Sequence, residues 1–208
     1  MIPTDAALRT LQVVGRDGRG LLVTWFQDDD RYGHEIAVVS GSKATVCLIA
    51  ETGRDRDPWP ASPPLQQYSL EASPLGRPTA LFIGMAGKSH WSQSIETDDS
   101  ATAALTFDVA CRVHRPPSWL GSTYRTNRAA QVLSASSVRL AVAEGVDVTV
   151  TALTGQASDH SFPGPIEVDG SQLAIAADSA KLRLPATVRW RYRIALDTAS
   201  AAQHGLTF

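Results

Sequence analysis

Hydrophobic and polar positions alternate with a period of two along much of this chain, most clearly between residues 90 and 113. From residue 90 to 96 the even positions are polar, whereas the odd positions hold Trp91, Gln93 and Ile95. From residue 107 to 113 the odd positions are apolar and the even positions carry polar or small side chains. Successive side chains of a β-strand point to opposite faces, so each segment predicts a strand with one apolar face.

A polar, turn-rich segment joins these two strands, which predicts an antiparallel hairpin. A shift of one residue would move the apolar set of one strand into water, so burial selects the register. Pairing Ile95 with Phe107 places the large apolar side chains on one face and sets Ser94 opposite Asp108. The polar face of the predicted hairpin then carries His90, Ser92, Ser94, Glu96, Asp108 and Arg112.

The other segments show the same short period, separated by tight turns. Asp17-Gly18, residues 40–43 and Asp169-Gly170 each divide two β-rich runs, and a long strand is predicted from Thr187 to Leu196. Residues 128–133 are the one stretch with the composition of a short helix. Ten or more strands with little helix predict an all-β fold, an antiparallel β-sandwich or flattened barrel.

Length and composition predict one β domain over residues 1–208, with a seam at 114–127 if the chain forms two β lobes. The 43% of hydrophobic and 19% of charged residues are typical of a soluble globular protein. A net charge of -2 gives no electrostatic case for nucleic acid or an anionic membrane. Without a leader pattern, or an apolar run of roughly 18 residues, a cytoplasmic protein is expected.

Cys47 and Cys111 both lie in apolar, strand-like runs. Free cysteine is among the most buried residue types, so we expect two core residues. A disulfide between Cys47 and Cys111 is the alternative.

The segment Gly84-Met-Ala-Gly-Lys-Ser89 shares its last three residues with a phosphate-binding loop. Phe82 stands where that motif needs its first glycine, and a strand pattern follows Lys88 where the motif needs a helix. We therefore expect a glycine-rich bend, in which Gly84 or Gly87 adopts a positive φ or marks a bulge.

Three acidic residues follow the run that ends in Trp25-Phe26. Asp28, Asp30 and His34 are candidate ligands for a hard cation such as calcium, although their spacing matches no complete calcium loop. A solvated acidic turn is the simpler interpretation, and no cofactor is predicted.

The polar face of the hairpin holds every residue type of a hydrolase site, namely a serine, a histidine and carboxylates. Ser92 and His90 are next to each other on that face, but strand geometry separates them by about 7 Å. Glu96 and Asp108 lie on facing strands, yet nothing besides their type indicates a glycosidase pair. An ordinary polar sheet surface explains the same pattern.

Arg189, Arg191 and Arg193 share one face of the predicted C-terminal strand. Three guanidinium groups in a row suit an anionic ligand. The interpretation we favour is that they protect an edge strand or form ion pairs. Trp119 and Tyr124 stand among proline and glycine residues, where aromatic side chains either stack on a ligand or close the end of a sandwich.

Three phrases in the middle of the chain resemble segments of uncharacterised bacterial proteins. They are Gly84-Met-Ala-Gly-Lys-Ser-His-Trp-Ser, Phe107-Asp-Val-Ala-Cys-Arg112 and Leu120-Gly-Ser-Thr-Tyr-Arg125. The resemblance implies no activity, cofactor or site.

The leading hypothesis is a soluble, non-enzymatic binding or interaction module for a polar small molecule, a sugar or a protein. Its site would be formed by the hairpin's polar face with loops 27–34 and 115–125. One alternative is a hydrolase on sugar or ester substrates that uses His90, Glu96 and Asp108, and another is a structural assembly subunit, with a homo-oligomer compatible with each. The candidate ligand-binding residues are His90, Ser92, Glu96, Asp108, Arg112, Trp119 and Tyr124.

Overall fold

A computed structural model of the chain describes residues 9–54, 56–73, 76–100, 102–154, 163–179 and 182–198. Within these ranges fifteen strands form two antiparallel sheets that pack face to face, which confirms the predicted all-β sandwich. Among the described residues no helix is long and apolar enough to cross a membrane.

The first sheet, sheet A, has seven strands. In spatial order they are β1 (Arg9–Val14), β2 (Arg19–Asp28), β3 (Arg31–Ser40), β4 (Lys43–Ala50), β9 (Gly121–Arg125), β14 (Gln172–Ala177) and β13 (Pro163–Asp169). The contact between β4 and β9 is short, since only two residue pairs join these strands.

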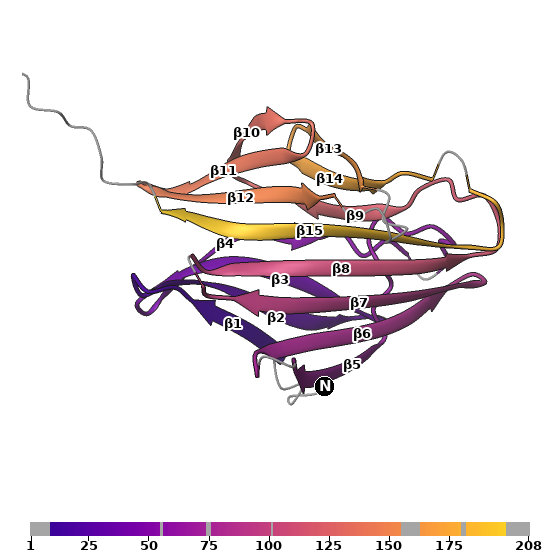
Figure 1. The fold of residues 1–208 in the computed structure, drawn as a ribbon, viewed down its shortest axis with the longest axis horizontal. Helices are drawn as coiled ribbons and strands as arrows, with labels where there is room; N and C mark the ends of the chain where they lie inside the picture. Colours follow the sequence, from indigo (N-terminus) through magenta and orange to yellow (C-terminus); the bar gives the residue numbers. More distant parts are fainter. Residues whose placement is uncertain are drawn as a thin grey trace, which may run out of the picture.

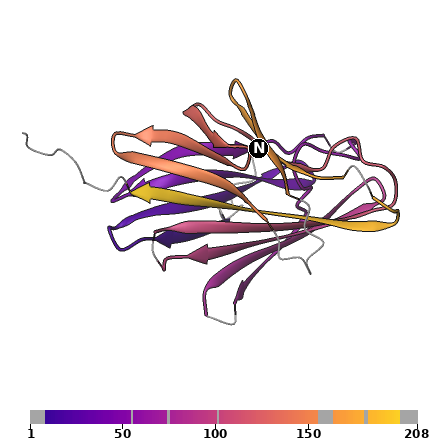
Figure 2. The same cartoon turned by 45° about the horizontal axis from the view of Figure 1, so that its top comes forward.

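The second sheet, sheet B, has eight strands and lies in front in Figure 1. From top to bottom of that view they are β10 (Ala129–Ser134), β11 (Ser137–Ala143), β12 (Val146–Leu153), β15 (Ala186–Thr198), β8 (Ala104–Val113), β7 (Ser89–Asp98), β6 (Pro78–Ala86) and β5 (Gln67–Ala72). Figure 2 shows the long β15, in yellow, crossing the molecule between β12 and β8.

The inner faces of both sheets fill one continuous hydrophobic core. Trp25 of sheet A lies 5.1 Å from Phe82 of sheet B, measured between ring centroids. Within sheet B, the rings of Phe107 and Tyr192 stack at 4.7 Å. Aromatic pairs at such distances add to the stabilisation that comes from burial alone. The core therefore fixes which face of each strand remains available at the surface.

The register of the β7–β8 hairpin is the predicted one. Ile95 pairs with Phe107, and Ser94 pairs with Asp108. The strands extend further than the sequence pattern indicated, since β8 begins at Ala104. Because the register is as predicted, the polar side chains of both strands share the outer face of sheet B.

Residues 128–133 are not helical as predicted, because most of them belong to strand β10. Ala129, Ala130 and Gln131 pair with residues of β11 in a hairpin. Helix propensity is a weak preference that a favourable strand pairing overrides. The prediction failed because the partner strand supplies hydrogen bonds that the local sequence does not reveal.

Other local predictions hold. Gly87 adopts φ 57° in the turn between β6 and β7, as expected for a glycine-rich bend. Gly84 allows a close approach, since a Cβ there would meet the backbone oxygen of Pro64. Cys47 and Cys111 are buried and free, and burial raises the pKa of each thiol to about 12.

Candidate functional site

The outer face of sheet B is the surface on which the polar side chains of the β7–β8 hairpin gather. Strand pairing aligns Ile83 of β6, Ser92 of β7, Ala110 of β8 and Arg189 of β15 in one row. The next row across the same four strands consists of Met85, His90, Arg112 and Thr187.

Two hollows lie along these rows. The first, of about 430 Å³, includes His90 at one end of the strands. The second, of about 510 Å³, extends along the strands to Asp108. Ile83, Ser92 and Ala110 line both hollows, so the two form one continuous depression. We call this depression the outer groove.

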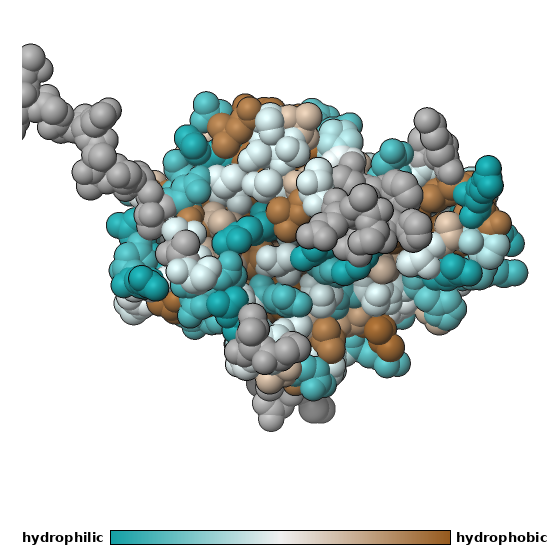
Figure 3. Space-filling model, in the orientation of Figure 1, coloured by the Kyte–Doolittle hydropathy of each residue, from teal (hydrophilic) through white to brown (hydrophobic). Residues whose placement is uncertain are grey.

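One wall of the outer groove is apolar. Leu81, Ile83 and Met85 project from β6 with exposed fractions of 37%, 53% and 47%. The alternate side chains of the same strand, such as Phe82, are in the core. In the orientation of Figure 1, brown apolar atoms lie over β6 beside paler and teal atoms over the neighbouring strands (Figure 3). Strand β6 is therefore apolar on both faces. Its inner face packs in the core, and its outer face can contact apolar atoms of a ligand.

The opposite wall is cationic and comes from β15. Arg189 donates from Nε to Oδ1 of Asp108 at 2.6 Å and from Nη2 to Oδ2. Nε of Arg191 lies 3.3 Å from the same Oδ2. One carboxylate therefore serves two guanidinium groups.

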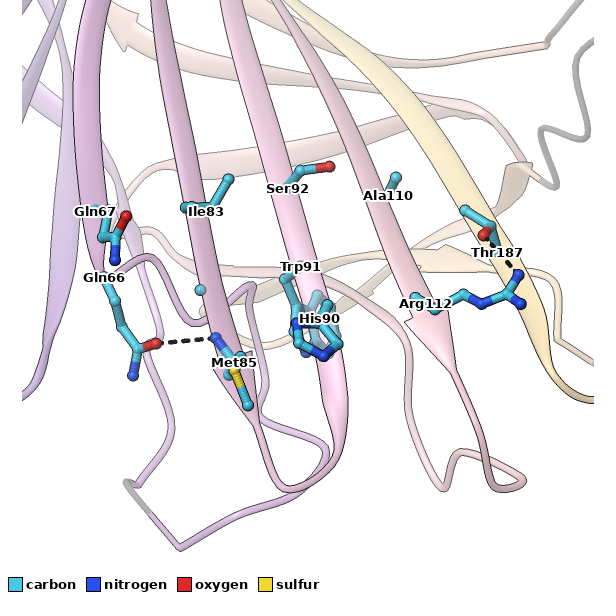
Figure 4. Close-up of a pocket in the computed structure, with 11 residues that line it drawn as sticks. Gln66, Gln67, Ile83, Met85, His90, Trp91, Ser92, Ala110, Arg112 and Thr187 are labelled. Atoms are coloured by element: carbon cyan, nitrogen blue, oxygen red, sulfur yellow. Dashed lines mark hydrogen bonds between the residues drawn. The ribbon is translucent and has the colours of Figure 1, made fainter.

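The third guanidinium of the groove belongs to Arg112. Its side chain reaches across to β15, where Nη1 donates to the Thr187 hydroxyl at 3.3 Å (Figure 4). In the part of the chain that the structure describes, no carboxylate lies within ion-pair distance of Arg112. Strand pairing sets His90 opposite Arg112, so an imidazole stands beside this guanidinium. Arg112 is consequently the group best placed to bind an added anion.

The floor between the walls is formed by small side chains. Ser92, Ser94 and Ala110 are too short to reach the height of the flanking leucine, isoleucine and arginine side chains. Successive outward positions of β7 and β8 thus supply hydroxyls and a methyl group at the base of the groove. This contrast in side-chain size creates a depression on an otherwise flat sheet.

Gln66 fixes the open end of the apolar wall. Its Oε1 accepts the backbone N–H of Met85 at 2.9 Å, and its Nε2 donates to Asp30 at 2.9 Å. The hydrogen bond from the Arg31 side chain holds the pKa of Asp30 below its usual value. The turn that joins β2 to β3 therefore contacts the rim of the groove through Gln66.

Two predicted site residues lie inside the sandwich instead. His34 is 3% exposed, and its Nε2 is 3.1 Å from the Tyr124 hydroxyl. That hydroxyl is 2.7 Å from the hydroxyl of Tyr192 in the opposite sheet. Burial lowers the pKa of His34 to about 4. Tyr124 is 1% exposed, so it has no surface with which to stack on a ligand in the groove.

The suggested cation ligands are not brought together. Asp28 accepts a hydrogen bond from Thr52, and Asp30 is engaged by Arg31 and Gln66. His34 points into the core, away from both carboxylates, because Trp25 and His34 pair on the inner face of sheet A. Over the described residues no group of three or more His, Cys, Asp or Glu side chains is arranged to hold a metal ion.

Trp119 and Glu96 also lie outside the groove. The Trp119 indole donates to the Ala61 backbone oxygen at 3.0 Å, in the crossover from sheet B to sheet A. Its ring lies where a side chain at Gly121 would be. Glu96 shares the outer face but lines neither hollow. Of the predicted set, His90, Ser92, Asp108 and Arg112 remain together.

No pattern in the sequence indicates that the arginine row lies beside this face. Arg189, Arg191 and Arg193 do share it, because β15 pairs with β8. The edge-strand explanation for the row is wrong, since β15 is flanked by β12 and β8. The ion-pair explanation is confirmed by Asp108 and by an Arg193–Asp98 contact of 3.1 Å.

Among the described side chains of the outer groove, the serine, histidine and carboxylate do not form a hydrogen-bonded nucleophile and base. Both oxygens of Asp108 are engaged by guanidinium groups, which leaves neither positioned to accept a proton from water or substrate. In the described structure Ser92 and His90 share no hydrogen bond. The arrangement is suited to binding an anion beside an apolar surface.

A comparison of the chain with known protein families, with curated proteins and with solved structures found no match. The function of the outer groove is therefore inferred from the chemistry of its own residues.

Proposed function

We propose that the chain is a non-enzymatic binding module and that its outer groove binds an acidic oligosaccharide. One observation carries this proposal: an apolar wall of three β6 side chains faces two guanidinium groups that share one carboxylate. A third guanidinium, that of Arg112, has no carboxylate within ion-pair distance among the described residues. A complementary ligand is elongated, apolar along one side and acidic at more than one point along the other.

A chain of uronic acid residues has this combination of properties. The C–H faces of its pyranose rings pack on aliphatic side chains such as Ile83, and its hydroxyls hydrogen-bond to serine side chains in the floor. Its carboxylates match guanidinium groups in a bidentate geometry. A ligand with one acidic end, such as a fatty acid, would use only part of the groove, because Arg112 and Arg189 belong to neighbouring rows about 7 Å apart along the strands.

Arg112 is the anchor in this arrangement. Its guanidinium has donors left after its single bond to Thr187, and the neighbouring His90 adds another donor. Asp108 acts as a counter-charge that keeps Arg189 and Arg191 extended along the wall. These roles favour binding over hydrolysis.

Isothermal titration calorimetry with trigalacturonate tests the proposal, with neutral maltotriose as the comparison. Binding of trigalacturonate alone is expected, and R112Q is expected to weaken it by about 10- to 100-fold, because a charge-assisted hydrogen bond contributes about 1.5–3 kcal/mol. R16Q, in the turn between β1 and β2, removes an equal charge elsewhere and serves as the matched control.

Two results would contradict the proposal. One is equal binding of maltotriose and trigalacturonate, which would remove the role of the guanidinium wall. The other is an equal loss of affinity in R112Q and R16Q, which would mean that net charge alone attracts the ligand.

A further inference from the structure

A separate pocket of about 410 Å³ lies at one end of the sandwich. It is formed where the turn between β6 and β7 meets residues 58–59 and the start of the crossover after β8. Its chemistry comes from Trp59, Lys88, His114 and Arg115. We call it the end pocket, and it shares no lining residue with the outer groove.

The aromatic wall of the end pocket is held in place by its own loop. Asp57 accepts the backbone N–H of Trp59 at 2.9 Å, and its own N–H donates to Arg54 at 3.0 Å. The Trp59 side chain is partly buried and packs against the core. The loop thus positions the Trp59 backbone, and the side chain lies between the core and the pocket.

The turn between β6 and β7, which carries Lys88, is also held in place by its contacts. Gly87 has φ 57°, and a Cβ on this residue would lie 3.1 Å from Cβ of Pro58. The backbone of the turn thus rests against the loop that precedes Trp59. Lys88 follows directly and lines the pocket.

The charge of the end pocket is not compensated. Lys88, His114 and Arg115 line it, whereas no acidic side chain does. Across the residues that the structure describes, none of these three side chains lies within ion-pair distance of a carboxylate. The arginine residues of the outer groove differ in this respect, because Asp108 partly neutralises them.

We infer that the end pocket is a second binding site and that it takes a small aromatic phosphate or sulfate ester. The ring of the ligand stacks on Trp59, as aromatic rings do on indole at centroid distances of about 4.5–7 Å. The oxyanion presents three oxygens to the side chains of Lys88, His114 and Arg115. A neutral aromatic compound would contact only Trp59, and an inorganic anion would contact only the cationic side chains.

Calorimetric titration with 1-naphthyl phosphate tests this inference, with 1-naphthol and inorganic phosphate as half-ligands. The ester is expected to bind at least about tenfold more tightly than either half-ligand, a difference of about 1.4 kcal/mol. The double variant K88Q/R115Q is expected to lose this binding. Because both side chains are exposed, the variant should fold normally, which its near-ultraviolet circular dichroism checks.

Two control variants separate the end pocket from other sites. K43Q changes the lysine that begins β4 and should leave the affinity for 1-naphthyl phosphate unchanged. R112Q in the outer groove should also leave it unchanged.

The inference is overturned by either of two outcomes. If inorganic phosphate binds as tightly as the ester, the pocket holds an adventitious ion only. If K88Q/R115Q binds the ester as well as the unmodified protein does, the pocket is not the binding site. Neither outcome affects binding of trigalacturonate, so the proposals for the outer groove and the end pocket are tested independently of each other.

Discussion

At the scale of single residues, the polar chain formed by His34, Tyr124 and Tyr192 joins the two sheets through the core. Each of the three side chains is buried, and each has a hydrogen-bond partner at 2.7 or 3.1 Å. Burial raises the pKa of both tyrosine hydroxyls, so they remain neutral at physiological pH. Pairing of the polar atoms offsets the cost of removing them from water.

Because His34 belongs to this hydrogen-bonded network, the free energy of unfolding depends on pH. Burial lowers the pKa of the folded imidazole from 6.5 to about 4, so between these values the unfolded chain binds a proton that the folded chain does not. Lowering the pH therefore favours unfolding. H34Q keeps a side chain that can hydrogen-bond to Tyr124 but has no titrating group in this range.

Urea unfolding at pH 7 and pH 5 measures this contribution. The unmodified protein is expected to lose about 2 kcal/mol more stability than H34Q between the two pH values, as linkage predicts for such a pKa difference. The same loss in both proteins would show that the imidazole is not kept neutral by the fold.

At the scale of elements, the β7–β8 hairpin shows what the sequence could predict. Its strands are joined by a short turn, and burial of Trp91 and Ile95 admits one register only. The polar set His90, Ser92, Asp108 and Arg112 followed from that register. Local alternation was sufficient because both strands carry a strong apolar face.

The rest of the site depends on pairings between distant segments. β15 lies beside β8 although more than 70 residues separate them, and no local signal indicates that Arg189 meets Asp108. Likewise, the sequence places Tyr124 among loop residues, whereas β9 turns its side chain into the core. The apolar wall does have a signal in the sequence, because Ile83 and its alternate neighbours in β6 are apolar on the face opposite to that of Phe82.

The pairing of β8 with β15 leads to a prediction for D108N. Loss of the carboxylate leaves Arg189 and Arg191 facing each other without their shared counter-charge. We expect a loss of about 1 kcal/mol in the free energy of unfolding, since these side chains are partly exposed. We also expect a several-fold gain in affinity for trigalacturonate, because the groove becomes more positive.

Urea unfolding and calorimetry on the same preparation of D108N check both parts. S92A, which alters the floor without changing charge, is the comparison. A weaker affinity of D108N for trigalacturonate would mean that Asp108 contacts the ligand directly and does not act as a counter-charge.

At the scale of the whole molecule, the two faces of sheet B have different roles. The inner face contributes Trp91, Phe107 and Trp190 to the core, and all three are at most 2% exposed. The outer face is free to carry the groove, since core packing does not constrain its side chains. A rigid sheet of this kind presents a ligand site with little loss of conformational entropy on binding.

The position of the ligand on this surface is the central claim, and nuclear magnetic resonance maps it directly. Trigalacturonate would be titrated into uniformly ¹⁵N-labelled protein while the backbone amide shifts are followed. We expect the largest shifts at and beside Ile83, Ser92, Ala110 and Arg189, in one band across β6, β7, β8 and β15. Largest shifts on sheet A or in the end pocket, or no shifts at millimolar ligand, would contradict the account.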